Sequence, residues 1–353
     1  MKQMTFADAE YAGKRKQTRK ELFLIEMGQV VPWKGLVALI EPQYPKGERR
    51  TRDMASAGRI LLDREREKGH ISFSTAASVD MAWRQFADIA RAKGVRRLEH
   101  VTEDLLMRYG AELAQQVARH ECTAGYAQRL ISAVNSVMRL ANPKWRRVNA
   151  VHDCGVPKRT AVRKEPPSGM DAQLVDAAIQ SLRLSDQAAA AAVVKLCWAL
   201  GLRIQEAALL NAKKAMSQAQ SDGCIEVRYG TKGGRKRVLR ILHAHQLEAL
   251  EAAAAIQAQG ISIIPSDLDW KMFRTSVLDR ARITLKAHGI VRFHDLRAAY
   301  ACRRYQELTG YPAPVLTGRI VEREADRVAR AEIALELGHN RISVVAAYVG
   351  GLA

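Results

Sequence analysis

The spacing of hydrophobic residues predicts three amphipathic helices between residues 72 and 148. Ser72, Ser74 or Thr75 is placed to cap the first helix, and Thr102 and Thr123 are placed to begin the second and third. Hydrophobic residues then recur every three or four positions, at Val79, Trp83, Phe86 and Ile89, at Leu105, Leu106, Tyr109 and Leu113, and at Tyr126, Leu130, Val134 and Leu140. This segment therefore predicts a small helical domain.

A second, larger domain is predicted from residue 171 to the end, and its pattern is helical with one β interruption. Residues 224–229 and 235–242 are strand-like and flank Gly-Thr-Lys-Gly-Gly, which indicates a hairpin. Ser266 with Asp269 resembles a capping box, and Gly289 would end that helix. Helices are predicted at 246–258, 267–287, 294–308, 324–337 and 341–349. The fold class is therefore mainly α with a small antiparallel sheet.

Two regions lack this periodicity. Residues 1–60 are basic and contain Pro32, Pro42 and Pro45, so we expect an appendage without a long helix. Residues 149–170 are basic and hold three prolines, which is typical of a linker that passes close to a polyanion. The predicted organisation is an appendage at 1–60, a helical domain at 72–148, a linker at 149–170 and a larger domain at 171–353.

The charge of the chain favours a nucleic-acid partner. Its 353 residues include 56 Lys+Arg against 37 Asp+Glu, a formal net charge of +19. Such an excess attracts polyanions, and release of counterions from DNA or RNA supplies much of the binding free energy. Proteins of the ribosome and of membrane surfaces share this signature. Because no apolar run approaches a membrane span and the N-terminus is no secretory signal, we expect a cytoplasmic, nucleoid-associated protein.

The sequence offers no metal or cofactor site. The five cysteines are isolated and odd in number, which favours reduced thiols in a cytosol. His243 and His245 come nearest to a metal pair, but they follow the predicted hairpin without further ligands. We therefore expect chemistry without metal or cofactor.

A basic edge follows the third predicted helix and is the candidate contact to the DNA backbone. For Trp145 two interpretations stay open: a surface aromatic that packs on Lys and Arg stems, or a contact to DNA. The candidate DNA-contact residues are Arg129, Arg139, Lys144, Trp145, Arg146 and Arg147.

The larger domain contains residues suited to phosphodiester exchange without a metal. Such a reaction needs guanidinium groups to neutralise the nonbridging oxygens, a nucleophile, and a proton donor for the departing 5′ oxygen. Arg203 lies in an apolar helical run, where a charge is costly unless it is paired or faces a cleft, and Glu206 shares its helix face.

Further candidates follow in compact motifs. His294 and Arg297 are three residues apart on one helical face, and Lys232 lies at the tip of the hairpin. His339 precedes Tyr348, the last aromatic residue, by nine positions. Each motif alone is weak, since His-x-x-Arg is commonly a solvated helix face and a lysine in a glycine turn is commonly just a turn residue.

Together and in this order, the motifs GLRIQE, TKGGRKR, HDLR and LGH, followed by Tyr348, resemble the signature of tyrosine recombinases and phage-type integrases over roughly residues 72–353. The resemblance implies a helical, SAM-like core-binding domain followed by the recombinase catalytic domain. It implies that Tyr348 attacks the scissile phosphate to form a 3′-phosphotyrosyl link, with His294 as base and Lys232 as general acid. Arg203, Arg297 and His339 would contact the phosphate oxygens.

The resemblance also implies partners: double-stranded DNA, a homotetramer on two DNA sites, and an accessory DNA-bending or directionality protein. Two features depart from the common pattern. The interval between His294 and His339 is long, which predicts an added loop and helix extension near 311–331. Only five residues follow Tyr348, where many relatives carry a segment that docks on a neighbour, so we expect that mode of control to be missing.

Residues 1–50 resemble the N-terminal stretch of insertion-sequence transposases with an acidic-triad, metal-dependent core, and none of that core follows. We interpret the chain as a natural chimera, with an additional DNA-binding arm as the alternative. Three different functions stay open: a single-duplex topoisomerase of type IB, an inactive DNA-binding product of the fusion, and a metal-dependent transposase.

Overall fold

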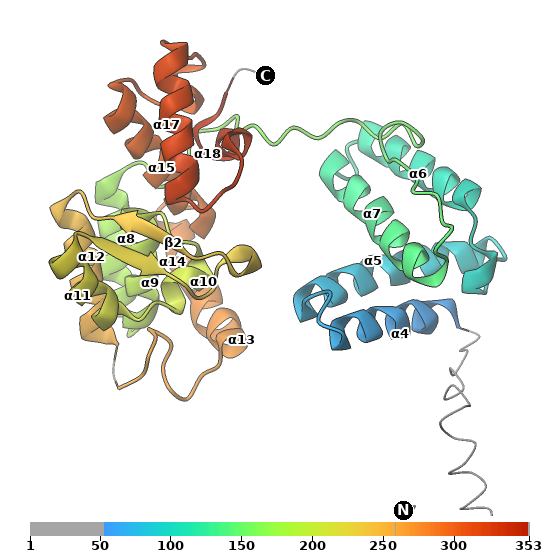
Figure 1. Cartoon of the computed structure of the whole chain (residues 1–353), viewed down its shortest axis with the longest axis horizontal. Helices are drawn as coiled ribbons and strands as arrows, with labels where there is room; N and C mark the ends of the chain where they lie inside the picture. Colours follow the sequence, from blue (N-terminus) through green and yellow to red (C-terminus); the bar gives the residue numbers. More distant parts are fainter. Residues whose placement is uncertain (1–52, 258, 352–353) are drawn as a thin grey trace, which may run out of the picture. The chain divides into compact units, whose positions relative to one another are not determined.

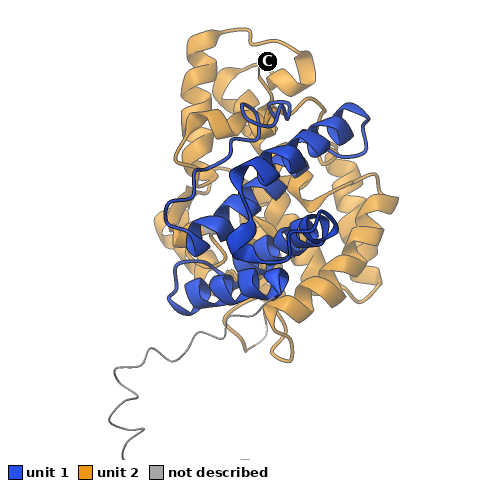
Figure 2. Ribbon diagram, turned by 90° about the vertical axis from the view of Figure 1, so that its right-hand side faces the viewer, with its two compact units in different colours: residues 1–159 blue, residues 160–353 orange. Residues whose placement is uncertain are grey.

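The computed structural model describes residues 53–257 and 259–351, apart from the side chain of Lys232. The chain divides into two compact units between Arg159 and Thr160 (Figure 2). All five cysteines are free thiols. Across the two described ranges, no helix has the length and hydropathy needed to cross a membrane. The transposase-like stretch and most of the expected appendage lie outside the described residues.

The first unit is a bundle of helices, three of which begin where the sequence predicts (Figure 1). The hydroxyl oxygens of Ser72, Thr102 and Thr123 each accept a backbone N–H three residues further on, at 3.2 Å. The three predicted helix starts are thereby confirmed. The described elements are α4 (Met54–Glu67), α5 (Phe73–Ala92), η1 (Leu98–His100), α6 (Glu103–Ala118) and α7 (Ala124–Ala141).

Helix α4 belongs to this unit, which corrects the expected boundary of the appendage at residue 60. Met54 is buried, and its carbonyl oxygen accepts a hydrogen bond from Trp83 Nε1 at 3.0 Å. A Cβ atom at Gly58 would lie 2.0 Å from the same Nε1 atom, so only glycine lets α4 approach the indole this closely. The start of α4 is rich in small residues, and no helix was predicted from the sequence there.

The residues after α7 also pack on the first unit. Trp145 is only 7% exposed, and its Nε1 donates to Asn135 Oδ1 at 3.0 Å. The same Asn135 oxygen accepts the backbone N–H of Val148, which ties the segment to α7. The prediction of a surface position for Trp145 is therefore wrong. Cys154 and Val156 join the same core, so the start of the predicted linker belongs to the first unit.

The second unit is mainly helical and contains one hairpin, which confirms the predicted fold class. Strands β1 (Cys224–Val227) and β2 (Arg237–Arg240) pair antiparallel with Ile225 opposite Leu239. The helical elements are α8 (Ala172–Leu184), α9 (Ala188–Leu200), α10 (Ile204–Ala208), α11 (Ala212–Asp222), η2 (Lys232–Gly234), α12 (Ala244–Ile256), α13 (Trp270–Met272), η3 (Phe273–Leu278), α14 (Asp279–Ala287), α15 (Phe293–Thr309), α16 (Pro314–Thr317), α17 (Arg323–Glu336), η4 (Ile342–Val345) and α18 (Ala346–Val349).

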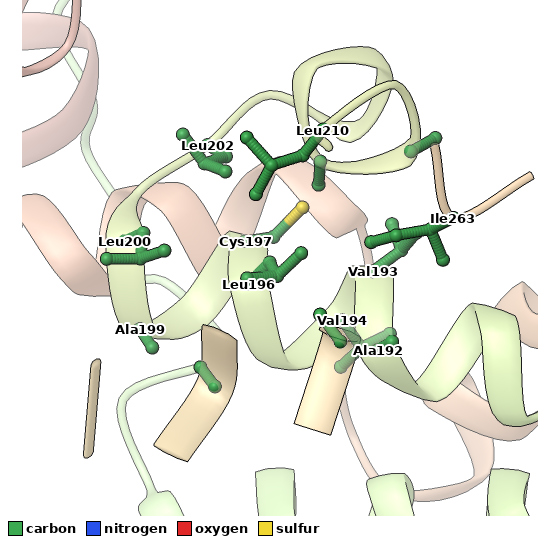
Figure 3. Close-up of a cluster of buried hydrophobic side chains, with 14 of the residues drawn as sticks. Ala192, Val193, Val194, Leu196, Cys197, Ala199, Leu200, Leu202, Leu210 and Ile263 are labelled. Carbon is green, nitrogen blue, oxygen red and sulfur yellow. The ribbon is translucent and has the colours of Figure 1, made fainter. Parts of the chain in front are cut away.

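Helix α9 is the centre of this unit. It packs against α8, α12 and α15, and most of its residues are buried. Figure 3 shows Leu196, Cys197 and Leu200 of α9 together with Leu210 and Ile263 from other parts of the unit. Burial of one such leucine side chain contributes about 2 kcal/mol. This rigid core carries the segment that follows α9 and contains Arg203.

Two local predictions are wrong in detail. Asp269 alone caps the helix that begins at Trp270, since its Oδ1 accepts the backbone N–H of Met272 at 2.7 Å, and Ser266 takes no part. The continuous helix predicted around Arg203 is interrupted, because Gly201 ends α9 with φ +61°. Tyr300 packs against Gly201 so closely that a Cβ atom there would lie 2.4 Å from its ring.

Candidate active site

The structure brings three of the predicted site residues, His294, Arg297 and His339, together around Tyr348. His339 Nε2 lies 3.1 Å from Tyr348 Oη, and Arg297 Nε donates to the same oxygen at 3.4 Å. The His294 ring lies 5.2 Å from the tyrosine ring, centroid to centroid. Tyr348 is only 4% exposed, whereas His294 is an exposed residue. Residues from separate parts of the second unit thus meet at one phenol.

His339 is placed by the end of α17. Gly338 has φ +66°, its N–H donates to the Leu335 carbonyl at 2.9 Å, and the N–H of His339 donates to the Ala334 carbonyl at 2.7 Å. These are the two hydrogen bonds of a Schellman motif, which requires a left-handed residue that is usually glycine. The Leu-Gly-His sequence therefore ends the helix and fixes the backbone of His339.

Tyr348 lies on α18, a helix of only four residues that cannot be stable alone. Its position depends on neighbours. Gly350 follows the helix with φ +77°, and a Cβ atom there would lie 2.8 Å from the backbone nitrogen of Val315. The Cys302 thiol donates to the Tyr348 carbonyl at 3.7 Å. Contacts with α15 and α16 therefore hold the tyrosine in place.

Arg297 is almost fully buried, at 1% exposure, and its charge is compensated by the ends of two helices. Its Nη1 donates to the carbonyl of Gly201, and its Nη2 donates to the carbonyl of Leu337 at 2.5 Å. Carbonyl groups at helix C-termini lack an intrahelical partner and carry partial negative charge. They stabilise the guanidinium beside Tyr348 without neutralising it.

Glu206 joins three arginines at the base of the cluster. Its carboxylate accepts from Arg203 Nη1 at 2.6 Å and from both terminal nitrogens of Arg237 at 2.9 and 2.7 Å, and it lies 3.7 Å from Arg297 Nη1. Burial raises the pKa of Glu206, but the hydrogen bonds and charge of Arg237, with the other arginines, lower it to about 2. Glu206 is therefore ionised at neutral pH.

The predicted pairing of Arg203 with Glu206 is confirmed, but by a different local structure. Arg203 is the N-cap residue of α10, and its backbone N–H donates to Glu206 Oε2 at 2.8 Å. The pair is a capping box across the first turn of a new helix. The Arg203 side chain is 21% exposed, so its guanidinium can be reached from solvent.

Both histidines near Tyr348 favour the neutral form. Burial, and the guanidinium groups of Arg297 and Arg203, lower the pKa of His339 to about 4. Partial burial and the charges of Arg297 and Arg163 lower the pKa of His294. Each neutral imidazole has one ring nitrogen that can accept a hydrogen bond or a proton, although the lowered pKa makes it a weaker base than a free histidine.

Lys232 begins the turn η2 between β1 and β2 as predicted, and Gly233 beside it has φ +72°. Its side chain is outside the described part of the structure. His243 and His245 stack with ring centroids 5.3 Å apart, and His243 Nε2 pairs with Glu307 at 3.1 Å. No group of three or more His, Cys, Asp or Glu residues in the described ranges has the arrangement of a metal site.

The candidate DNA-contact residues separate into exposed and buried groups. Arg129, Arg139, Lys144, Arg146 and Arg147 are all exposed. Trp145 is a core residue. Arg129 and Arg147 line one polar groove of about 380 Å³ in the first unit. Arg159, which was not predicted from the sequence, lines it too, as do Ser132 and Ser136.

Arg237 is the main site residue that was not predicted from the sequence. Besides its two bonds to Glu206, its Nε donates to the Glu336 carbonyl at 2.8 Å, and its side chain is 6% exposed. A signal was available: alternation along β2 places Arg237 on the same face as buried Leu239. A charged residue on the buried face of a strand indicates a partner in the interior.

Comparison with known proteins agrees with these observations. Residues 161–303 match the family model described as Integrase. A lambda integrase dimer bound to a COC′ core site is 18% identical with a TM-score of 0.52, over 82% of this chain and 93% of that chain. The Tn1549 transposon integrase in complex with transposon right end DNA is 13% identical with a TM-score of 0.53, over 84% of this chain and 95% of that chain. The resemblance inferred from the motifs is confirmed.

Proposed function

We propose that this chain, which carries an integrase domain and has the tyrosine recombinase fold, is a site-specific DNA recombinase that cleaves and rejoins DNA through Tyr348. The observation that carries the proposal is the placement of the Tyr348 hydroxyl between His339 Nε2, at 3.1 Å, and Arg297 Nε, at 3.4 Å. A nucleophile, a neutral base and a permanent positive charge meet there, which is the set that a metal-free attack on phosphate requires.

In the proposed reaction, Tyr348 Oη forms a bond to the scissile phosphorus while the bond to the 5′ oxygen breaks. The phenol proton passes to a neutral histidine, and we assign this role to His339, which holds the hydrogen bond, in place of His294. Lys232 supplies a proton to the departing 5′ oxygen. Arg203 and Arg297 stabilise the charge on the nonbridging oxygens. Because one phosphodiester replaces another, a free 5′-hydroxyl can reverse the step and join a new strand.

The DNA partner is proposed from charge and from the compared structures. The chain carries a net charge of +19, and Arg129, Arg147 and Arg159 line one groove with two serines. Arginine and hydroxyl groups are typical contacts to the DNA backbone. We propose double-stranded DNA as the substrate, four copies acting on two sites, an accessory DNA-bending or directionality protein, and action at the nucleoid in the cytoplasm.

The test is covalent trapping on a nicked DNA substrate built from the sequences that flank the gene, since an integrated element lies beside its attachment site. The wild type should form a protein–DNA adduct that resists denaturation, and Tyr348→Phe should form none. Tyr311→Phe, which removes the hydroxyl of a tyrosine that is 40% exposed, is the matched control and should cleave normally. Absence of an adduct with wild type on every flanking site would reject the proposal and favour a DNA-binding protein without cleavage activity.

Two further measurements distinguish a recombinase from a topoisomerase and from a metal-dependent transposase. A topoisomerase of type IB would relax one supercoiled duplex without joining strands between two duplexes, so we expect strand exchange in addition to relaxation. A metal-dependent transposase would lose its activity in EDTA, whereas we expect adduct formation to continue in EDTA. Strand exchange that EDTA abolishes would contradict the proposed chemistry.

A further inference from the structure

The first residues of the second unit lie directly on the helix that carries His294 and Arg297. Arg163 Nη2 donates to Asp295 Oδ1 at 2.8 Å, and Ser168 Oγ donates to Asp295 Oδ2, also at 2.8 Å. Asp295, at 6% exposure, follows His294 in the first turn of α15. Both oxygens of this buried carboxylate are thus bound by residues of segment 163–169, which lies far from α15 in the chain.

The same segment also contacts the helix that carries Tyr348. The backbone N–H of Arg163 donates to the carbonyl of Ala346 at 2.9 Å. Ala346 begins α18, and its carbonyl also accepts the N–H of Gly350 at 3.2 Å. Since α18 has only four residues, each external bond matters for its position. Arg163 therefore joins the helix of His294 to the helix of Tyr348.

Segment 163–169 fits closely along its length. A Cβ atom at Gly169 would lie 3.3 Å from Leu296 Cα, and the Gly169 carbonyl accepts from Trp198 Nε1 at 2.9 Å. Arg163 Nε donates to the carbonyl of Glu165 at 2.7 Å, so one guanidinium binds its own segment and Asp295 at once. The guanidinium reaches its two acceptors from two separate nitrogens, Nε and Nη2, in one planar fork that a lysine lacks.

We propose that Arg163 is a positioning residue for Tyr348: bound to Asp295, it holds α15 and α18 in the arrangement that aligns the nucleophile with His339 and Arg297. Only the expected effect of Arg163 on the cleavage rate rests on the proposed cleavage function. The positional effect belongs to the free protein and is measured there.

The first experiment is hydrogen exchange of the full-length protein without DNA. In Arg163→Gln and in Asp295→Asn, exchange in peptides covering 342–350 should rise about tenfold. Lys164→Gln, which removes the same charge from the adjacent position, should leave exchange at the wild-type rate. Peptides from α12 serve as the internal reference and should not change. Unchanged exchange at 342–350, or an equal rise in α12, would overturn the proposal.

The second experiment measures the adduct formation rate at saturating nicked DNA, together with DNA affinity. Each single variant should cleave about tenfold more slowly at unchanged affinity, because misplacement of a reacting group by about 1 Å costs a large factor in rate. The double variant should be no slower than Asp295→Asn alone, since that substitution already removes the ion pair with Arg163. Additive losses, or an equal loss in Lys164→Gln, would reject the role of this bond. If the wild-type protein forms no adduct, the proposed function is rejected. The hydrogen-exchange experiment, which uses no DNA, would still test whether Arg163 positions the helix of Tyr348.

Discussion

Replacement of Glu206 by glutamine should destabilise the second unit strongly while keeping the size of the side chain. The carboxylate is 1% exposed and lies among Arg203, Arg237 and Arg297. Glutamine removes its negative charge and places an NH₂ group where one oxygen now accepts from a guanidinium. Three positive charges would then share a buried site without their common counterion.

The magnitude follows from the pKa of Glu206. Its folded value of about 2, against an ordinary value of 4.5, corresponds to about 3 kcal/mol in favour of the folded state at neutral pH. For a carboxylate with a lowered pKa, this contribution is present above pH 4.5 and is lost as the pH falls towards 2. The difference between wild type and Glu206→Gln should therefore be about 3 kcal/mol at pH 7 and about 2 kcal/mol at pH 3.5.

The assay is urea unfolding of both proteins at the two pH values, with Glu324→Gln as the control. Glu324 pairs with Arg327 on the exposed surface of α17, and its loss should have a far smaller effect. A difference below about 1 kcal/mol at pH 7, or one that grows as the pH falls, would refute the argument that Glu206 is the counterion of the arginine cluster.

Three further predictions concern α15 and α17. Tyr300→Phe and Tyr305→Phe each remove a hydroxyl that donates to a buried carboxylate on α17 at 2.9 Å. Each substitution should lower the free energy of unfolding, measured in urea, by about 1–2 kcal/mol. Only Tyr300→Phe should also slow adduct formation, because Tyr300 binds Glu336 at the end of α17. The His339 ring should titrate near pH 4 by NMR, and a midpoint above about 6 would contradict its burial beside the arginines. The free energy of unfolding should fall as the pH drops from 6.5 to 4, because the unfolded chain then binds a proton that the folded ring does not. Gly338→Ala, at φ +66° and with its new Cβ 3.1 Å from Arg237 Cδ, should lower stability by about 1 kcal/mol or more in thermal unfolding, and an unchanged melting temperature would contradict this.

Features encoded by neighbouring residues could be predicted from the sequence. The hydroxyls of Ser72, Thr102 and Thr123 satisfy N–H groups three residues away, and the hairpin between β1 and β2 follows from its glycine turn. The ordered motifs around Arg203, His294 and His339 carried the resemblance to integrases for the same reason, since each lies within a short stretch of backbone. Capping and periodicity act over a few residues, so a sequence displays them directly.

The partners of the buried charges depended on the tertiary structure. Arg237 meets the carbonyl of Glu336 from 99 positions away, and Arg163 meets Asp295 from 132 positions away. The basic stretch around Trp145 predicted a surface position, but in the structure its indole N–H donates to Asn135 in the core. A buried polar group must find its partner wherever packing brings one. Which helix ends receive Arg297, and which loop holds the helix of Tyr348, is therefore decided only when the helices pack.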